Sequence, residues 1–192
     1  MNIIIFGPPG AGKGTQSKFI EKKYNLLQLS TGELLRNEIK NKTQLGLEIS
    51  SIINSGDLVS DDIVSKLIEK YISDKKNKQR LIFDGYPRNI DQAKNLDNLL
   101  KKYNQQIDIV LKLSVSLETI KKRISERKSQ EQRTDDSDEI AIKRFKTYEL
   151  SSEPVLDYYK RSNLLKVING ENTISEINVE ISGLIDAIKG WL

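Results

Sequence analysis

The segment GPPGAGKGT, at residues 7–15, directly follows the apolar run Ile3–Phe6. It contains the spacing G-x-x-x-x-G-K, which is typical of a phosphate-binding loop. Glycines let such a loop turn so that several backbone N–H groups point at the phosphates, and a helix beginning near Lys13 would add the positive end of its dipole. A lysine would gain nothing in a glycine-rich turn without a ligand, so we favour phosphate binding. The residues expected to contact the phosphates are Gly10, Ala11, Gly12, Lys13, Gly14 and Thr15.

Short apolar runs alternate with longer helical patterns along the rest of the chain. Buried strands that alternate with helices indicate a parallel sheet covered on both faces. The sequence therefore predicts an α/β fold of three layers, in which a five-stranded parallel sheet is flanked by helices. The expected strands are residues 2–6, 26–29, 80–84, 108–113 and 164–168, and the first expected helix is 13–23.

Helix boundaries are signalled by side chains that can cap them. Residues 30–33 and 173–176 have capping-box spacing, and a further capped helix is expected to start near Ser60. The stretch 128–138 is almost wholly polar, which predicts an exposed, mobile loop. Since there is no internal repeat and no Pro/Gly-rich linker, we expect residues 1–192 to form a single domain.

Missing residue types exclude several kinds of chemistry. The 192 residues include no cysteine and no histidine. A disulfide, a thiolate zinc site, a cysteine nucleophile and a Ser-His-Asp triad are therefore all excluded. Any catalysis must use other side chains.

Charge and hydropathy bear on the partners. The net charge is +4, from 31 Lys+Arg against 27 Asp+Glu, but the lysines are scattered over expected solvent faces, so we expect no nucleic-acid partner. No apolar run approaches the ~20 residues needed to span a bilayer. The early run Ile3–Phe6 is too short for a signal-peptide core. We expect a cytoplasmic protein with no membrane partner.

Two positions concern a metal ion that would accompany bound phosphates. The residue after Lys13 is Gly14, where the general loop has a Ser or Thr that ligates Mg²⁺. We therefore expect Mg²⁺ to be held largely through water, as this ion often is. Asp84 ends an expected strand, where its carboxylate suits an Mg²⁺-bound water; the alternative is a turn aspartate before glycine.

Four segments in order resemble the nucleoside monophosphate kinases, and the resemblance covers nearly the whole chain. They are residues 7–16, residues 30–36 (STGELLR), residues 84–88 (DGYPR), and residues 133–136 with Arg144 eleven residues after Arg133. The resemblance implies reversible, Mg²⁺-dependent phosphoryl transfer between two nucleotides. It also implies a mobile helical flap over 30–59 that binds the monophosphate.

Two side chains make the chain similar to the adenylate kinases within that family. These enzymes carry Thr at the position of Thr31 and a glutamine at the position of Gln92. An amide offers the donor and the acceptor that the adenine edge needs. The resemblance thus implies that ATP and AMP are converted to two ADP. A pyrimidine monophosphate kinase is one alternative, and a nucleotide-binding protein without catalysis is another.

The resemblance also assigns roles to residues. Those implied to bind AMP are Thr31, Arg36, Asp57, Leu58, Val59, Gly85, Tyr86, Pro87, Arg88, Gln92, Arg133 and Arg144. Beside the phosphate loop, those implied to bind ATP are Arg127 and Asn172, the latter through its backbone carbonyl. The implied catalytic set is Lys13, Arg88, Arg123, Arg133 and Arg144, with Asp84 and Glu33 near the Mg²⁺-bound waters.

The expected division of the chain follows the same resemblance. The core comprises 1–29, 60–126 and 138–192, the AMP-binding subdomain 30–59, and a short lid 127–137. Only five residues, 128–132, separate Arg127 from Arg133, so the zinc-binding insertion of long-lid forms is not expected. By resemblance we expect a monomer. An AMP phosphate oxygen is already ionised at pH 7, so the reaction needs no histidine base.

Overall fold

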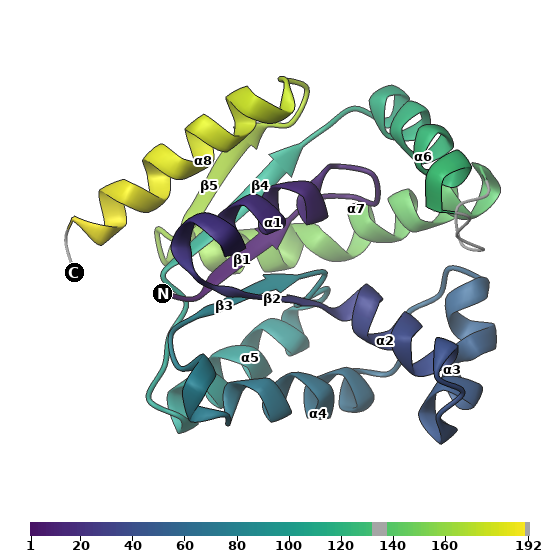
Figure 1. Cartoon of the computed structure of the whole chain (residues 1–192), viewed down its shortest axis with the longest axis horizontal. Coiled ribbons are helices and arrows are strands. Elements are labelled where there is room, and N and C mark those ends of the chain that lie inside the picture. The colour runs from purple at the N-terminus through teal and green to yellow at the C-terminus, as the bar shows by residue number, and fades with distance from the viewer. Residues whose placement is uncertain (132–137, 191–192) are drawn as a thin grey trace.

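A computed structural model describes residues 1–131 and 138–190, and its elements alternate between strands and helices (Figure 1). The strands are β1 (Ile3–Phe6), β2 (Leu27–Ser30), β3 (Leu81–Asp84), β4 (Ile109–Ser114) and β5 (Leu165–Asn169). The helices are α1 (Lys13–Tyr24), α2 (Thr31–Lys40), α3 (Gln44–Asn54), α4 (Asp61–Ile72), the 3₁₀ turn η1 (Lys75–Asn77), α5 (Ile90–Lys102), α6 (Leu117–Glu131), α7 (Asp138–Arg161) and α8 (Ile174–Lys189).

The five strands form one parallel sheet in the order β2-β3-β1-β4-β5, which confirms the predicted fold class. The five predicted strands are all present, each within a residue of its expected bounds. The phosphate-loop strand β1 is central and pairs with both β3 and β4. In the register of the sheet Ile5 pairs with Asp84, and Ser30 of β2 also pairs with Asp84. Parallel strands end at a common edge, so this register gathers the ends of β1, β2 and β3.

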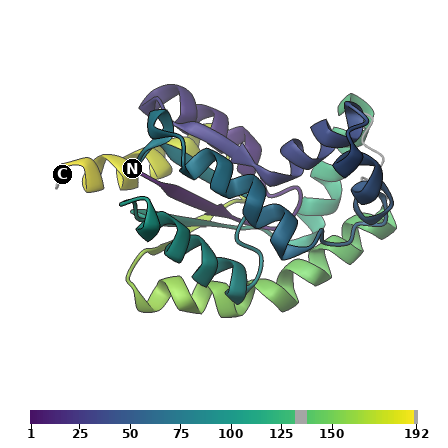
Figure 2. The same ribbon diagram turned by 90° about the horizontal axis from the view of Figure 1, so that it is seen from below.

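Each face of the sheet is covered by its own apolar core. Side chains alternate along β1, so Ile4 faces one core and Ile3 the other. The first core contains residues of α4, α5 and α7, and the second contains residues of α1 and α8. Together the layers give the three-layer architecture, with α2 and α3 at the end of the molecule remote from both termini (Figure 2).

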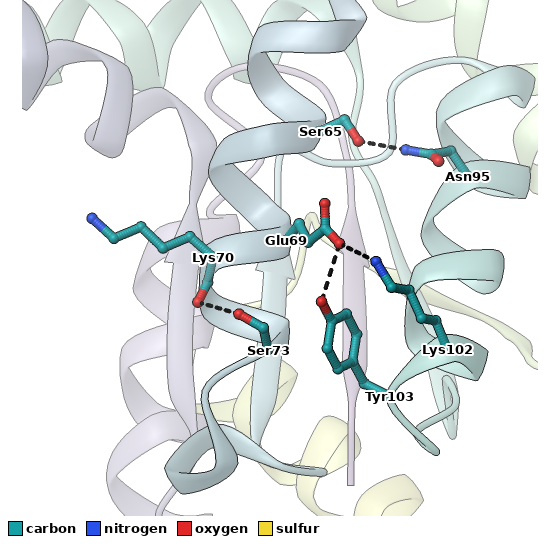
Figure 3. Close-up of polar contacts among 7 residues, drawn as sticks. All are labelled: Ser65, Glu69, Lys70, Ser73, Asn95, Lys102 and Tyr103. Carbon is teal, nitrogen blue, oxygen red and sulfur yellow. Dashed lines mark hydrogen bonds and ion pairs between the residues drawn. The ribbon is translucent and has the colours of Figure 1, made fainter.

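Polar contacts hold α4 and α5 together along their length. The Glu69 carboxylate accepts from Lys102 Nζ at 2.9 Å and from Tyr103 Oη at 3.1 Å. Nearer the start of both helices, Asn95 Nδ2 donates to Ser65 Oγ at 2.6 Å. Figure 3 shows these contacts, which fix the position of α4 relative to α5 along the helix axes.

The expected helix starts are confirmed in part. Thr173 and Glu176 form a complete capping box, and Ser30 Oγ accepts from the Glu33 N–H. Ser60 occupies the N-cap of α4, but its side chain makes no capping hydrogen bond. Asp61 and Asp62 instead place negative charge in the first turn, where it favours the helix dipole.

The prediction of a loop over 128–138 was wrong at its start. Helix α6 continues to Glu131, and α7 begins at Asp138. Lys, Ser, Gln and Glu at 128–131 are acceptable helix formers, so a polar composition alone does not end a helix. The predicted lid residues 132–137 lie outside the described residues. Within 1–131 and 138–190, no helix has the length and apolar character needed to cross a bilayer.

The close approach of α2 and α3 generates a test of the fold. A methyl group on Gly46 would overlap the carbonyl of Glu38 and lie 2.7 Å from Ile39 N, so backbone would have to move. We expect Gly46→Ala to lower the free energy of unfolding by about 1–3 kcal/mol in urea titrations.

Gly183→Ala in α8 is the control, because nothing lies within 4 Å of a methyl group there. It should leave stability unchanged or raise it by up to about 1 kcal/mol. Equal stability of the two variants would contradict the described packing of α2 on α3.

Candidate active site

The phosphate loop leaves β1 through glycines that adopt conformations other residues avoid. Gly10 has φ +83° and Gly12 has φ +94°, both in the left-handed region. Gly12 is also the N-cap of α1, so Lys13 begins the helix as predicted. A methyl group on Gly10 would lie 3.0 Å from Ile124 Cγ1, so this glycine also lets α6 approach the loop.

Lys13 lies folded against its own loop. Its ammonium donates to the carbonyls of Gly7 at 2.8 Å and Pro8 at 3.1 Å. Burial lowers its pKa to about 8; Asp84 opposes this shift, while Arg88, Arg144 and Arg127 add to it. Three guanidinium groups and one carboxylate thus act on this ammonium, and the excess of cations favours an anionic ligand.

Asp84 ends β3 beside the phosphate loop. Its side chain is buried, and Oδ2 accepts from Gln28 Nε2 at 3.0 Å and lies 4.0 Å from a methyl group built on Gly14. No cluster of three His, Cys, Asp or Glu able to hold a metal occurs within the described ranges. A single carboxylate fits a small divalent ion that keeps most of its waters and binds ligand phosphates.

The turn after β3 is tied to the start of α2. Gly85 has φ +76°, and its carbonyl accepts from Arg88 Nε at 2.8 Å and from Thr31 Oγ1 at 3.0 Å. The Thr31 hydroxyl is thus occupied by backbone. A methyl group on Gly85 would lie 2.9 Å from Thr31 Oγ1, so a larger residue would push this turn away from α2.

The predicted arginines that the structure describes come from three helices and the turn before α5. Arg36 lies across Gly32 on α2, with Nη1 3.2 Å from the position of a methyl group there. Arg144 on α7 packs against Gly56, with Cγ 3.3 Å from a methyl group there. Arg123 on α6 donates to the carbonyls of Ala11 at 3.3 Å and Gly170 at 2.9 Å, so it joins the phosphate loop to the β5–α8 turn.

One cleft brings nearly all of the predicted residues together. Its main part has a cavity volume of about 840 Å³ and is lined by the phosphate loop, Asp84, Glu33, Arg123 and Arg127. A narrower extension is lined by Thr31, Asp57, Leu58, Val59 and Gln92, and both parts share Arg36, Gly85, Arg88 and Arg144. Tyr86 and Pro87 line the main part. Arg133 lies outside the described residues.

Asn172 is the described site residue that does not line this cleft. It lies in the turn before α8, and its Oδ1 accepts from Asn169 Nδ2 at 3.1 Å. Ile174 and Ile177, slightly further along the chain, line the cleft instead.

Sequence reasoning missed one wall of the cleft entirely. Thr147, Tyr148, Ser151 and Ser152 of α7 line it together with Arg144. Burial raises the pKa of Tyr148 to about 12, so its hydroxyl stays protonated. The helical spacing from Arg144 was the signal that could have found this wall, since residues three, four, seven and eight positions on share one helix face.

Comparison with known proteins agrees with this geometry. A family model described as adenylate kinase matches residues 5–164. The adenylate kinase of Pelagibacter ubique is 42% identical over 211 residues, covering 96% of this chain and 99% of the relative. That of Fusobacterium nucleatum is 39% identical (94% and 96% covered), and that of Porphyromonas gingivalis is also 39% identical (98% and 97% covered).

The chain belongs to the adenylate kinase family. Adenylate kinases are phosphotransferases that act on nucleoside monophosphates, so this chain is an enzyme of that class. The family also uses a divalent metal with its nucleotide, which agrees with the single carboxylate at Asp84. The alignment with the Pelagibacter adenylate kinase is longer than the 192 residues of this chain, so that relative carries residues that this chain lacks.

The environment of Lys13 predicts a titration that nuclear magnetic resonance can follow. With the ligand-free protein labelled at lysine Cε, we expect the Lys13 signal to titrate with a pKa of about 8. Saturating ATP should raise that pKa, because bound phosphates favour the ammonium form. Lys13→Met identifies the signal by its loss. A midpoint above about pH 10, the range of an ordinary lysine, would contradict the described burial.

Proposed function

We propose that this enzyme transfers the γ-phosphoryl group of Mg²⁺-bound ATP to AMP, giving two ADP, in the cleft described above. The observation that carries the proposal is the convergence of Lys13, Arg88, Arg127 and Arg144 beside Asp84, since all five residues line the main part of the cleft. Such a cation set suits two polyphosphates that must approach each other.

On the donor side, Lys13 exchanges the carbonyls of Gly7 and Pro8 for the β- and γ-phosphates. The N–H groups of the phosphate loop hold the same phosphates at the N-terminus of α1. Bound Mg²⁺ supplies charge neutralisation on the donor phosphates, and Asp84, with Glu33 nearby, would hold its waters. Arg127 and the backbone near Asn172 complete the ATP site.

On the acceptor side, AMP occupies the narrower extension of the cleft. Arg88 and Arg36, which line both parts, hold its phosphate where the donor enters. Gln92 lines the extension and meets the adenine edge, while Leu58 and Val59 pack on the base. Since the attacking oxygen is already ionised, the catalytic contribution is positioning and charge stabilisation, and no general base is required.

Closure over the nucleotides involves the flap 30–59 and the lid 127–137. The flap already contacts α7: Lys143 Nζ lies 2.6 Å from Asp57 Oδ1 and donates to the Ser55 carbonyl at 3.0 Å. Arg123, Arg133 and Arg144 then close around the transferring group and keep water from competing as the acceptor.

The proposal extends to the setting of the enzyme. We infer a monomer in the cytoplasm that balances the adenine nucleotides, with ATP, AMP and ADP as partners and neither membrane nor nucleic acid among them. Light scattering coupled to size-exclusion chromatography tests the monomer, and a stable dimer would overturn that part alone.

A coupled assay of ADP formation tests the function. ATP-Mg²⁺ is offered with AMP, CMP, UMP or GMP, and we expect rapid ADP formation with AMP only. Strong activity with CMP or UMP would instead indicate a pyrimidine monophosphate kinase. If none of the four monophosphates supports ADP formation, the result would favour a nucleotide-binding protein without catalysis.

Arg88 provides a test of the proposed mechanism. Arg88→Ala should lower kcat by about 100-fold or more, because it removes a cation from the developing charge of the transition state. Arg80→Ala is the matched control: Arg80 also donates to a backbone carbonyl, that of Asn25 at 2.7 Å, but it does not line the cleft. A normal kcat in a folded Arg88→Ala enzyme would rule out the proposed role.

A further inference from the structure

The side-chain amide of Gln92 is held from both ends by groups that differ in hydrogen-bonding character. The backbone N–H of Arg88 donates to Gln92 Oε1 at 2.7 Å, and Gln92 Nε2 donates to Asp61 Oδ1 at 2.6 Å. A backbone N–H can only donate, and an ionised carboxylate can only accept. Only one of the two orientations of the amide satisfies both neighbours.

The two contacts leave a defined part of the amide free for a ligand. An amide oxygen accepts two hydrogen bonds and an amide nitrogen donates two, so one acceptor site and one donor hydrogen remain on Gln92. The side chain is only 4% exposed and lines the narrower extension of the cleft. In this orientation the pair matches adenine, whose N6 amino group donates and whose N1 accepts.

The opposite orientation would match a different base. Hypoxanthine carries an oxygen at position 6 and a hydrogen on N1, so it needs the donor and the acceptor exchanged. AMP and IMP differ only at this edge. The orientation of the Gln92 amide therefore decides between them, and Asp61 is the one side chain among the two groups that fix it.

Asp61 is equipped to fix that orientation because both of its oxygens are used. Its Oδ2 accepts from Asn89 Nδ2 at 2.8 Å. Asn89 is in turn fixed, since its Oδ1 caps α5 by accepting from the backbone N–H of Gln92 at 2.8 Å. Asp61 thus faces two amide nitrogens. An asparagine at this position could accept from only one of them.

Asp61 and Gln92 belong to different helices, and the packing of those helices keeps them opposite each other. Asp61 begins α4, and Ser65, one turn later, accepts from Asn95 of α5. Glu69 binds Lys102 and Tyr103 at the far end of the same helix pair (Figure 3).

We propose that Asp61 is a positioning residue for acceptor specificity, which orients the Gln92 amide so that the site selects a 6-aminopurine monophosphate over a 6-oxopurine one. The inference rests on the proposed function, because it requires AMP to occupy the extension of the cleft. Asp61 acts through Gln92 and touches no reacting atom.

The test compares AMP with IMP as acceptors for wild type, Asp61→Asn and Asp62→Asn. In Asp61→Asn we expect the ratio of kcat/KM for AMP to that for IMP to fall by about tenfold or more, the scale of one misplaced bidentate contact. The fall should come from a higher KM for AMP. Asp62→Asn removes the same charge from the same turn of α4 and should keep the wild-type ratio. Asp61→Glu, which retains the carboxylate, should recover part of the wild-type preference for AMP over IMP.

A second background separates positioning from a general structural effect. In Gln92→Ala, adding Asp61→Asn should not change the ratio further, because no amide remains to orient. An unchanged ratio in Asp61→Asn, or an equal fall in the Gln92→Ala background, would overturn the inference and leave the proposed function intact. A wild-type enzyme inactive with AMP would overturn the proposed function itself. If Asp61→Asn fails to fold, Asp61→Ala, which also removes the acceptor for Gln92 Nε2, takes its place with the same expected fall.

Discussion

A buried ammonium group surrounded by guanidinium groups is the constraint on which the cleft depends. Burial, opposed by Asp84 and aided by three arginines from separate parts of the fold, lowers the pKa of Lys13 to about 8. Holding like charges together costs free energy, which the two apolar cores on either side of the sheet must offset. The same arrangement would stabilise bound phosphates, so the repulsion within the ligand-free site and its proposed affinity for polyphosphate have one cause.

The topology of the parallel sheet brings these charged side chains close together. Because β1, β2 and β3 end at the same edge, the phosphate loop, the start of α2 and the Asp84 turn become neighbours although the sequence separates them widely. Thr31 and Arg88 then both bind the Gly85 carbonyl, and Arg123 ties the loop to the turn after β5. Backbone carbonyls therefore hold three of the cationic side chains, Lys13, Arg88 and Arg123, before any nucleotide arrives.

The elements that local sequence determines were predictable. Apolar runs marked the five strands, and glycine spacing marked the phosphate loop, whose positive φ angles at Gly10 and Gly12 need that residue. Motif resemblance found most of the cleft. The α7 wall was missed, because a helix face shows which residues lie together but not what they face. The hydrogen bond from Gln92 to Asp61 could not be predicted from the sequence either, because it joins residues 31 positions apart through the packing of two helices.

This contact suggests how the enzyme separates selection of the base from capture of the phosphate. The proposed flap, residues 30–59, comprises α2, α3 and the turn after α3, and Asp57 of that turn forms an exposed ion pair with Lys143 of α7. Exposed ion pairs contribute little to stability, which suits a segment that is proposed to open. Asp61 and Gln92 belong to α4 and α5, whose apolar faces pack in the same core as Leu35 of α2 and Ile49 of α3. The amide proposed to meet the base is thus oriented by Asp61 and Arg88, which lie outside the proposed flap, so movement of the flap would not require its orientation to change.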